Sequence, residues 1–195
     1  MRTSEISRKT YETDIHLKLN IDGSGNGSIS TGIGFFDHML DLFTRHGLFD
    51  LALKAVGDLH VDFHHTVEDV GLCLGAAFKQ AIGDKYGINR YGFSSLPMDE
   101  TLVNVSVDVS GRPILNLVNP LENRSAGDFP LDLVKVFFQA FSGQGGITAH
   151  AFLITGSDPH HAAEAFFKGF GRALREALEK DARVQGIPST KGSLD

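Results

Sequence analysis

The strongest constraint on the fold of this chain is an internal repeat. The pattern Asp-x-His-His-x-x-Glu occurs at Asp62–Glu68 and again, 96 residues later, at Asp158–Glu164. The match continues downstream without a gap, for example from Gly75 to Gly171. Two copies in register are hard to attribute to chance, so repetition should organise the fold. We predict two half-domains at 1–90 and 91–187, followed by a tail at 188–195 with a Ser/Lys loop.

The hydrophobic patterns predict the same order of elements in both halves. Alternating apolar residues indicate strands, and apolar residues spaced by three and four indicate helices. In the first half we expect strands at 15–21, 51–56 and 59–63, a short helix at 36–43 and a longer helix after 63. In the second we expect strands at 103–109, 114–118 and 148–153, a short helix at 133–141 and a longer one through 166–178. This order predicts an α+β fold: each half is a small, mostly antiparallel sheet with helices on one face, and the helix layers pack together.

Composition excludes several classes of protein. The chain has 195 residues, and its one cysteine, Cys73, rules out an internal disulfide and favours a reducing, cytoplasmic setting. A net charge of −6 argues against non-specific nucleic-acid binding. No apolar run is long enough for a membrane helix, so we expect neither nucleic acid nor membrane as a partner. A few converging basic groups would still hold a small anionic ligand.

The repeated motif carries the residue types of a metal site. His64, His65 and Glu68 lie within one predicted helical turn, as do the matching His160, His161 and Glu164. Adjacent residues diverge by about 100° around a helix, so each pair of histidines should serve two different metals. Imidazole and carboxylate ligands suit Mn, Fe or Zn.

Other candidates are weaker when each is taken alone. The alternative for the repeated histidines, a solvated helix end, is less convincing for a duplicated motif than for a single one. His38 and His150 are further candidate ligands, ahead of His16, His46 and His60. The basic residues Arg90, Arg112, Lys168 and Lys191 are candidates for an anion clamp, although any single one is more often a surface charge. Glu12 fits an acid–base group or a cap, Asp99 and Glu100 fit a turn, and Cys73 fits an inert core position.

Several motifs in a fixed order resemble those of one known family. They are 36–40 (FDHML), 45–50 (RHGLFD), Gly57-Asp58, both HHxxE copies, 90–92 (RYG), 97–100 (PMDE), 110–113 (SGRP), 167–170 (FKGF) and 188–192 (PSTKG). Together they are similar to the imidazoleglycerol-phosphate dehydratases of histidine biosynthesis. The resemblance covers nearly the whole chain, from Arg8 to Lys191.

The resemblance implies a fold, an assembly and a reaction. The fold is a duplicated half-domain of the ribosomal protein S5 domain 2 type, and the assembly is a homo-oligomer of 24 subunits. The enzyme is a lyase that dehydrates D-erythro-imidazole-glycerol phosphate to imidazole-acetol phosphate, with two Mn²⁺ ions per active site built between subunits.

The resemblance also implies roles for individual residues. One metal takes His38, His65, Glu68 and His161, and the other takes His64, His160, Glu164 and a residue of the second short helix. Glu12 acts as an acid–base group beside the ligands His65, Glu68, His161 and Glu164. The substrate phosphate is held by Arg90, Arg112, Lys168, Ser189 and Lys191.

One position departs from the family pattern. Where the family has His or Glu before the Phe-Phe of the second short helix, this chain has Val136, which cannot ligate a metal. One metal should therefore lose a protein ligand, and His150 is the nearby residue we consider as a substitute. Two alternatives stay open: a metal-bound member that is catalytically weak or repurposed, and a dinuclear metallohydrolase.

Overall fold

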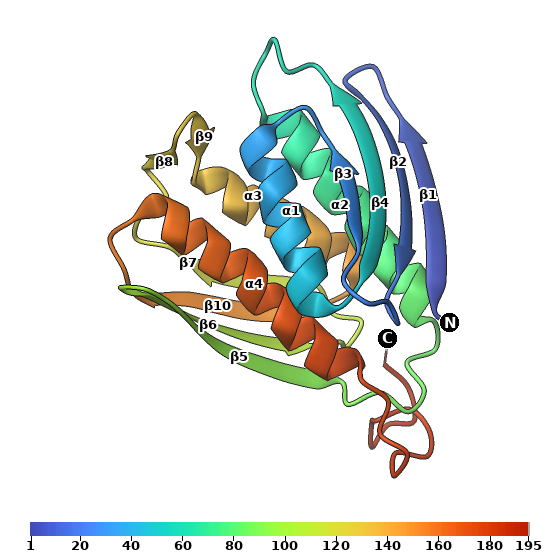
Figure 1. The fold of residues 1–195 in the computed structure, drawn as a ribbon. Helices are drawn as coiled ribbons and strands as arrows, with labels where there is room; N and C mark the ends of the chain where they lie inside the picture. The colour runs from blue at the N-terminus through green and yellow to red at the C-terminus, as the bar shows by residue number, and fades with distance from the viewer. Residues whose placement is uncertain (195) are drawn as a thin grey trace.

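The computed structural model describes residues 1–194 and contains two four-stranded sheets with four helices between them (Figure 1). The first half consists of β1 (Thr3–Lys9), β2 (Thr13–Asn20), β3 (Gly27–Ser30), α1 (Gly34–Gly47), β4 (Asp50–Gly57) and α2 (His64–Ile82). The second consists of β5 (Tyr91–Met98), β6 (Thr101–Asp108), β7 (Ile114–Val118), β8 (Ser125–Ala126), β9 (Phe129–Pro130), α3 (Asp132–Gly145), β10 (Thr148–Thr155) and α4 (Pro159–Leu178). Apart from the small β8–β9 hairpin, the two halves have the same order of strands and helices.

The two sheets also share one topology. Their strand orders are β1-β2-β4-β3 and β5-β6-β10-β7, and each contains two antiparallel pairs and one parallel pair. The parallel pair, β3–β4 or β7–β10, is the one bridged by the short helix of that half. The predicted α+β fold with mostly antiparallel sheets is therefore confirmed.

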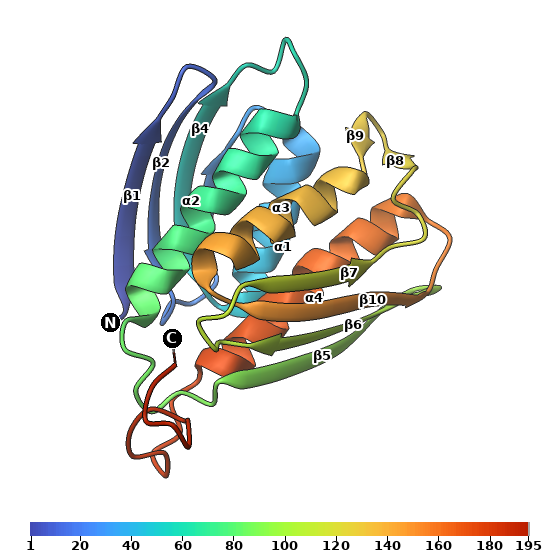
Figure 2. The ribbon, with the colours of Figure 1, turned by 180° about the vertical axis from the view of Figure 1, so that it is seen from behind.

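The helices form a double layer in which the halves exchange partners. Each long helix covers its own sheet: α2 packs on β1 and β2, and α4 packs on β5 and β6. Each short helix packs beside the long helix of the other half, α1 beside α4 and α3 beside α2 (Figure 2). Phenylalanine rings from all four helices fill the space between the sheets. The predicted packing of helix layer on helix layer is confirmed, and it joins residues that are far apart in sequence.

Glycines allow the paired helices to approach closely. A Cβ atom placed on Gly75 of α2 would lie 2.3 Å from the carbonyl oxygen of Phe141 on α3. The matching Gly171 of α4 would place it 2.5 Å from the carbonyl oxygen of Phe43 on α1. Both distances are too short for any side chain, so the repeat preserves the same helix contact in both halves.

The sequence prediction was wrong at 59–63 and missed several short or edge strands. The segment 59–63 forms a turn, in which the amide of Val61 donates to the carbonyl oxygen of Asp58. The strands β1, β3, β5 and the β8–β9 hairpin were not predicted. β1 and β5 are edge strands, and the inward-facing residues of β1 are Ser4, Ile6 and Arg8, of which only Ile6 is apolar, so its apolar signal is weak.

No helix within the described chain is long and apolar enough to cross a membrane. The cytoplasmic location expected from the cysteine count stays a prediction.

Candidate metal centre and phosphate cleft

One group of three potential metal ligands converges where α1 meets α4. The Nε2 atoms of His38 and His160 lie 3.0 Å and 2.9 Å from the same oxygen, Oε1 of Glu164. Within residues 1–194 this is the one set of three histidine, cysteine or carboxylate ligands whose atoms lie within 4.8 Å of one another. Neighbouring ligands of a six-coordinate ion are about 3 Å apart when the bonds are about 2.1 Å long, so the donor set fits a divalent metal. We call His38, His160 and Glu164 the α1–α4 group.

Local structure fixes the two members of this group on α4. Asp158 caps the helix, because its side chain accepts from the amides of His160 and His161, and Pro159 occupies the first turn. The ring of Phe35 on α1 meets the His160 ring edge-on at 5.2 Å between centroids. Asp158 and Pro159 therefore begin the helix and place His160 and His161 in its first turn, as the sequence predicted for the two histidines.

The Glu164 carboxylate is held as an anion in a buried place. Its residue is 7% exposed, and Lys168 donates to Oε2 at 2.6 Å. Burial raises the pKa of Glu164, but the hydrogen bonds from Lys168, His38 and His160 outweigh this effect and lower the pKa to about 2. A charged carboxylate that already faces two imidazoles is organised for cation binding.

The corresponding residues on α2 and α3 do not converge in this way. We call His64, Glu68 and Val136 the α2–α3 group. Glu68 is exposed and has no hydrogen bond or ion pair among residues 1–194. Val136 is the fifth residue of α3, as His38 is the fifth residue of α1, and its partly buried side chain packs against the core. Val136 therefore holds the place in α3 that His38 holds in α1, and its side chain has no ligand atom.

The second histidine of each repeated pair is oriented by a carboxylate. Nδ1 of His65 lies 3.0 Å from Oδ2 of Asp58, and Nδ1 of His161 lies 2.8 Å from Oε2 of Glu100. A proton on Nδ1 that is donated to a carboxylate leaves the Nε2 lone pair for a metal. Both rings therefore have the arrangement typical of metal ligands.

In each of these pairs the carboxylate and the imidazole stabilise the charged form of the other. Hydrogen bonds to Asp58 and Glu100 raise the pKa values of His65 and His161, respectively. The hydrogen bond from His161, followed by that from the Asp158 amide, lowers the pKa of Glu100 to about 2. Sequence reasoning missed Asp58 as a partner and favoured a turn role for Glu100. Asp58 precedes the HHxxE helix α2 in the chain, and Glu100 lies beside the start of the HHxxE helix α4 in the fold. These positions were the available signal.

Within one chain the candidate histidines form their own set of contacts, while the grouping of ligands that the resemblance implies between subunits stays a prediction. The resemblance placed His38 with His65 and Glu68, whereas within one chain His38 contacts Glu164 across the α1–α4 interface. His150 does not replace the missing ligand, because it faces outward from β10, where it lies 3.4 Å from Asn116 of β7. The helices cover the opposite face of that sheet, so this expectation was wrong.

The three weaker candidates also lie outside the α1–α4 group. His16 is hydrogen-bonded to Ser7 on β1, His60 lies in the turn at 59–63, and His46 lies in the last turn of α1. Cys73 is buried, and desolvation raises the pKa of its thiol to about 11, which confirms it as an inert core residue.

Four of the five predicted phosphate-binding residues line one cleft. The cleft has a volume of about 770 Å³ and is formed by the start of β5, the turn after β6 and the C-terminal tail. Its lining includes Arg90, Arg112, Ser189 and Lys191. The fifth candidate, Lys168, lies elsewhere in the chain and forms an ion pair with Glu164.

Arg90 ties the tail to the second sheet. Its guanidinium donates to both carboxylate oxygens of Asp108 at 2.7 and 3.1 Å and to the carbonyl oxygen of Pro188 at 2.9 Å. It also stacks over the ring of Tyr91. Nη2 of Arg112 lies farther from Asp108, at 3.7 Å from Oδ2, and its side chain is more exposed, so Arg112 is the freer of the two arginines.

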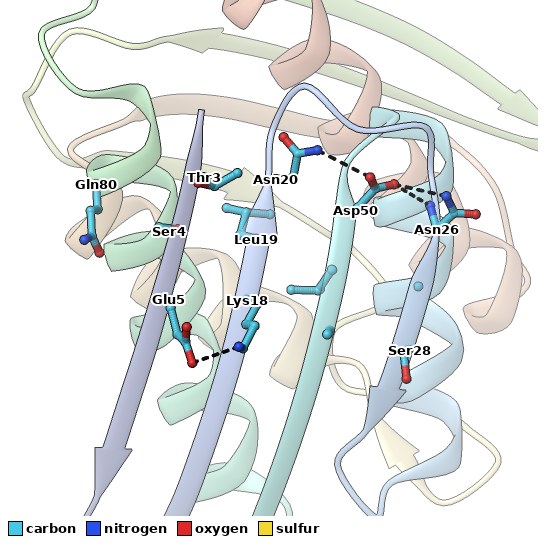
Figure 3. A pocket seen from close by; sticks show the side chains of 13 residues that line it. Thr3, Ser4, Glu5, Lys18, Leu19, Asn20, Asn26, Ser28, Asp50 and Gln80 are labelled. Carbon is cyan, nitrogen blue, oxygen red and sulfur yellow. Dashed lines mark hydrogen bonds and ion pairs between the residues drawn. The ribbon is translucent and has the colours of Figure 1, made fainter. Parts of the chain in front are cut away.

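A second hollow, of about 660 Å³, lies on the outer face of the first sheet (Figure 3). Its charged groups are already paired: Lys18 lies 3.3 Å from Glu5, and Asp50 accepts from the amides of Ser24 and Asn26. This surface therefore offers no unpaired set of converging charges.

Comparisons with known proteins identify the family and the fold of the chain. The sequence model of the family "Imidazoleglycerol-phosphate dehydratase" matches residues 31–174. Similar curated proteins of that name come from Thermoanaerobacter pseudethanolicus, 59% identical over 100% of both chains, and Acetivibrio thermocellus, 57% identical over 99% of both. The fold is similar to a crystal structure of imidazoleglycerol-phosphate dehydratase from Staphylococcus aureus, with a TM-score of 0.83 and 38% identity over 92% of this chain and 99% of that one. The Pyrococcus furiosus enzyme in complex with (S)-C348 has a TM-score of 0.84 and 35% identity over 97% of this chain and 100% of that one.

Proposed function

This chain belongs to the imidazoleglycerol-phosphate dehydratase family of histidine biosynthesis, and on that premise we propose its reaction and its cofactor. The enzyme removes water from D-erythro-imidazole-glycerol phosphate and releases imidazole-acetol phosphate. It does so with two Mn²⁺ ions per active site. The α1–α4 group carries this proposal, because two imidazoles already share one carboxylate oxygen there.

The donor chemistry of the residues supports manganese. The candidate ligands are imidazole nitrogens and carboxylate oxygens, and the one thiol of the chain is buried in the core. Such a set suits Mn²⁺ and offers no soft ligand. When bound, the ions supply Lewis-acid stabilisation of charge on the substrate and hold it in place.

Ligands from more than one chain complete the site in this proposal. His64, His65 and Glu68 on α2 and the α1–α4 group lie on different helix pairs, and only the latter converges within residues 1–194. We therefore propose that ligands of one copy meet those of another in a homo-oligomer of 24 subunits. This arrangement would also let the two adjacent histidines of each pair serve separate ions.

The remaining residues bind the substrate and move a proton. Arg90, Arg112, Ser189 and Lys191 bind the phosphate in the cleft, and this contact positions the carbon chain for elimination. The carboxylate of Glu12 lies 3.9 Å from Nε2 of His65 and exchanges the proton between substrate carbon and water. Loss of a hydroxyl from one carbon and a proton from its neighbour leaves an enol, which becomes the ketone when the carbon that lost the hydroxyl accepts a proton and the enol hydroxyl releases one.

The proposal is tested by adding Mn²⁺ back to protein stripped of metal. Dehydration of imidazole-glycerol phosphate should appear as Mn²⁺ binds, and it should be greatest at two ions per chain. Bound metal without dehydration would favour a repurposed member of the family. Hydrolysis of simple phosphate esters, measured in the same samples, would instead favour a dinuclear metallohydrolase.

A further inference from the structure

We propose that Asp69 is a positioning residue for Glu12. Asp69 accepts a hydrogen bond from the hydroxyl of Thr13 and forms an ion pair with the guanidinium of Arg8. These two contacts anchor the turn between β1 and β2 and leave the Glu12 carboxylate free for proton transfer. The inference rests on the proposed function, in which Glu12 is the acid–base group. It assigns a role to a residue that is neither a metal ligand nor a phosphate ligand in that function.

Asp69 joins the turn to the helix that carries His65. It follows His65 by four residues on α2, so the two side chains share a face of the helix. Its carboxylate is 8% exposed, and its Oδ2 atom accepts from Oγ1 of Thr13 at 2.5 Å and lies 2.5 Å from Nη1 of Arg8. Arg8 lies in β1 and Thr13 begins β2, so one buried oxygen holds both strands of the hairpin.

The hairpin of the second half shows the alternative arrangement. Glu100 immediately precedes β6, as Glu12 immediately precedes β2, and each is followed by a threonine. Thr101 donates to Oε1 of Glu100 at 3.0 Å. Glu100 also accepts from the amides of Ser157 and Asp158 and faces His161 at 2.8 Å. It is held by four groups and is unsuited to move a proton.

The first hairpin lacks these restraints on its glutamate. The hydroxyl of Thr13 is bonded to Asp69, and the α4 residue that matches Asp69 in the repeat is Ala165. Within the described chain the Glu12 carboxylate has one basic neighbour, Nε2 of His65 at 3.9 Å, and the Glu12 side chain is 54% exposed. Asp69 is therefore one structural difference between the two hairpins, because it holds the threonine hydroxyl that in the second half bonds to the glutamate.

The backbone of Glu12 is fixed although its carboxylate is free. The amide of Glu12 donates to Oγ1 of Thr10 at 3.1 Å, and the amide of Asp58 donates to the Glu12 carbonyl oxygen at 3.1 Å. Asp58 in turn orients His65. The anchor at Asp69 thus fixes the distance between Glu12 and His65, and misplacement of a reacting group by about 1 Å is enough to cost roughly 100-fold in rate.

The experiment compares Asp69→Asn with wild type and with matched variants. Asp69→Asn should lower kcat by about tenfold or more, because the turn loses its ionic anchor, while KM and Mn²⁺ binding change less than about twofold. Thr13→Val removes the hydroxyl that donates to Asp69, and it should also lower kcat. The control is Ser4→Ala, which removes a buried hydroxyl bond between β1 and the end of α2, 2.9 Å from the Ala77 carbonyl oxygen, without touching the turn; it should leave kcat unchanged.

A double-mutant cycle with Glu12→Gln decides whether Asp69 acts through Glu12. In the Glu12→Gln background, Asp69→Asn should no longer reduce the residual turnover, because the group that it positions is gone. A reduction of equal size in both backgrounds would overturn the proposal, as would an effect confined to KM or to Mn²⁺ binding. The outcome for these variants does not bear on the proposed function, which is decided only by whether the wild-type protein with Mn²⁺ dehydrates imidazole-glycerol phosphate.

Discussion

The α1–α4 group and the α2–α3 group occupy equivalent places in the repeat and differ in how their carboxylates are held. Glu164 is buried and bonded to His38, His160 and Lys168. Glu68 is exposed and without a partner among residues 1–194. Two replacements account for the difference: Val136 stands in place of His38, and Leu72 stands in place of Lys168.

The comparison shows that a duplicated backbone does not carry duplicated chemistry. The helix pairs and the glycine contacts are repeated, because they depend on the fold of each half, whereas the carboxylates that orient His65 and His161 come from different places in the two halves. The polar partners around each glutamate are set by single side chains, so they diverged independently. The α1–α4 group is therefore held in place by contacts within one chain, whereas no contact among residues 1–194 holds the Glu68 carboxylate.

The largest effect expected is loss of activity when either glutamate loses its charge. Glu164→Gln and Glu68→Gln should each lower kcat by at least about 100-fold and reduce bound Mn²⁺, since each removes an anionic ligand. They should differ in the metal-free protein: Glu164→Gln lowers Tm because Lys168 loses its buried partner, and Glu68→Gln does not. Steady-state rates, metal analysis and thermal unfolding measure this. Glu179→Gln is the surface control, and full activity in either ligand variant would contradict the site assignment.

The next effect tests whether the two helix contacts are equivalent. Gly75→Ala and Gly171→Ala should each destabilise the protein by about 1–3 kcal/mol, because the added methyl groups would overlap carbonyl oxygens of the facing helices. Denaturant unfolding of both variants measures the cost. Gly143→Ala on α3 is the control, since its methyl group meets no atom within 4 Å and should be neutral or stabilising by up to about 1 kcal/mol. Unequal costs at Gly75 and Gly171 would contradict the equivalence of the two contacts.

A smaller effect should come from restoring the missing ligand. Val136→His should tighten the weaker Mn²⁺ site by about tenfold, because it supplies an imidazole where His38 supplies one in the other half. His38→Val should weaken the other site by a similar factor. Titration of free Mn²⁺, followed by electron paramagnetic resonance, resolves the two affinities. Two equal affinities in the wild type, unaffected by Val136→His, would show that position 136 has no role in metal binding.

The smallest effect concerns the acid stability of the metal-free protein. The pKa of Glu164 is lowered in the folded state to about 2, so its contribution to stability is present above its ordinary pKa of 4.5 and is lost as the pH falls toward 2. The difference in Tm between wild type and Glu164→Gln should therefore be greatest above about pH 5 and shrink in acid. A difference that stays constant from pH 6 to pH 3 would contradict the ion pair. Glu68→Gln should retain the acid dependence of the wild type, because Glu164 is still present.

Much of the architecture could be predicted from the sequence, because it depends on patterns within each half. The repeat of HHxxE, the amphipathic spacing from Phe36 to Phe43 and the alternation from Val103 to Val109 correctly predicted two helical layers and two sheets. The edge strand β7 was predicted, but the edge strands β1, β3 and β5 escaped detection, because one side of an edge strand has no partner and selects weakly for apolar residues. The segment 59–63 was mistaken for a strand because its composition alternates while its hydrogen bonds close a turn.

The spacing of the histidines and glutamates along the chain is enough to place them on one face, at the first turns of two related helices. Which of them meet depends on how the helices pack. His38 and Glu164 are separated by 126 residues, and they touch because the short helix of each half buries its apolar face against the long helix of the other. That choice depends on how two amphipathic layers bury the most apolar surface together, and no pattern within either half encodes it.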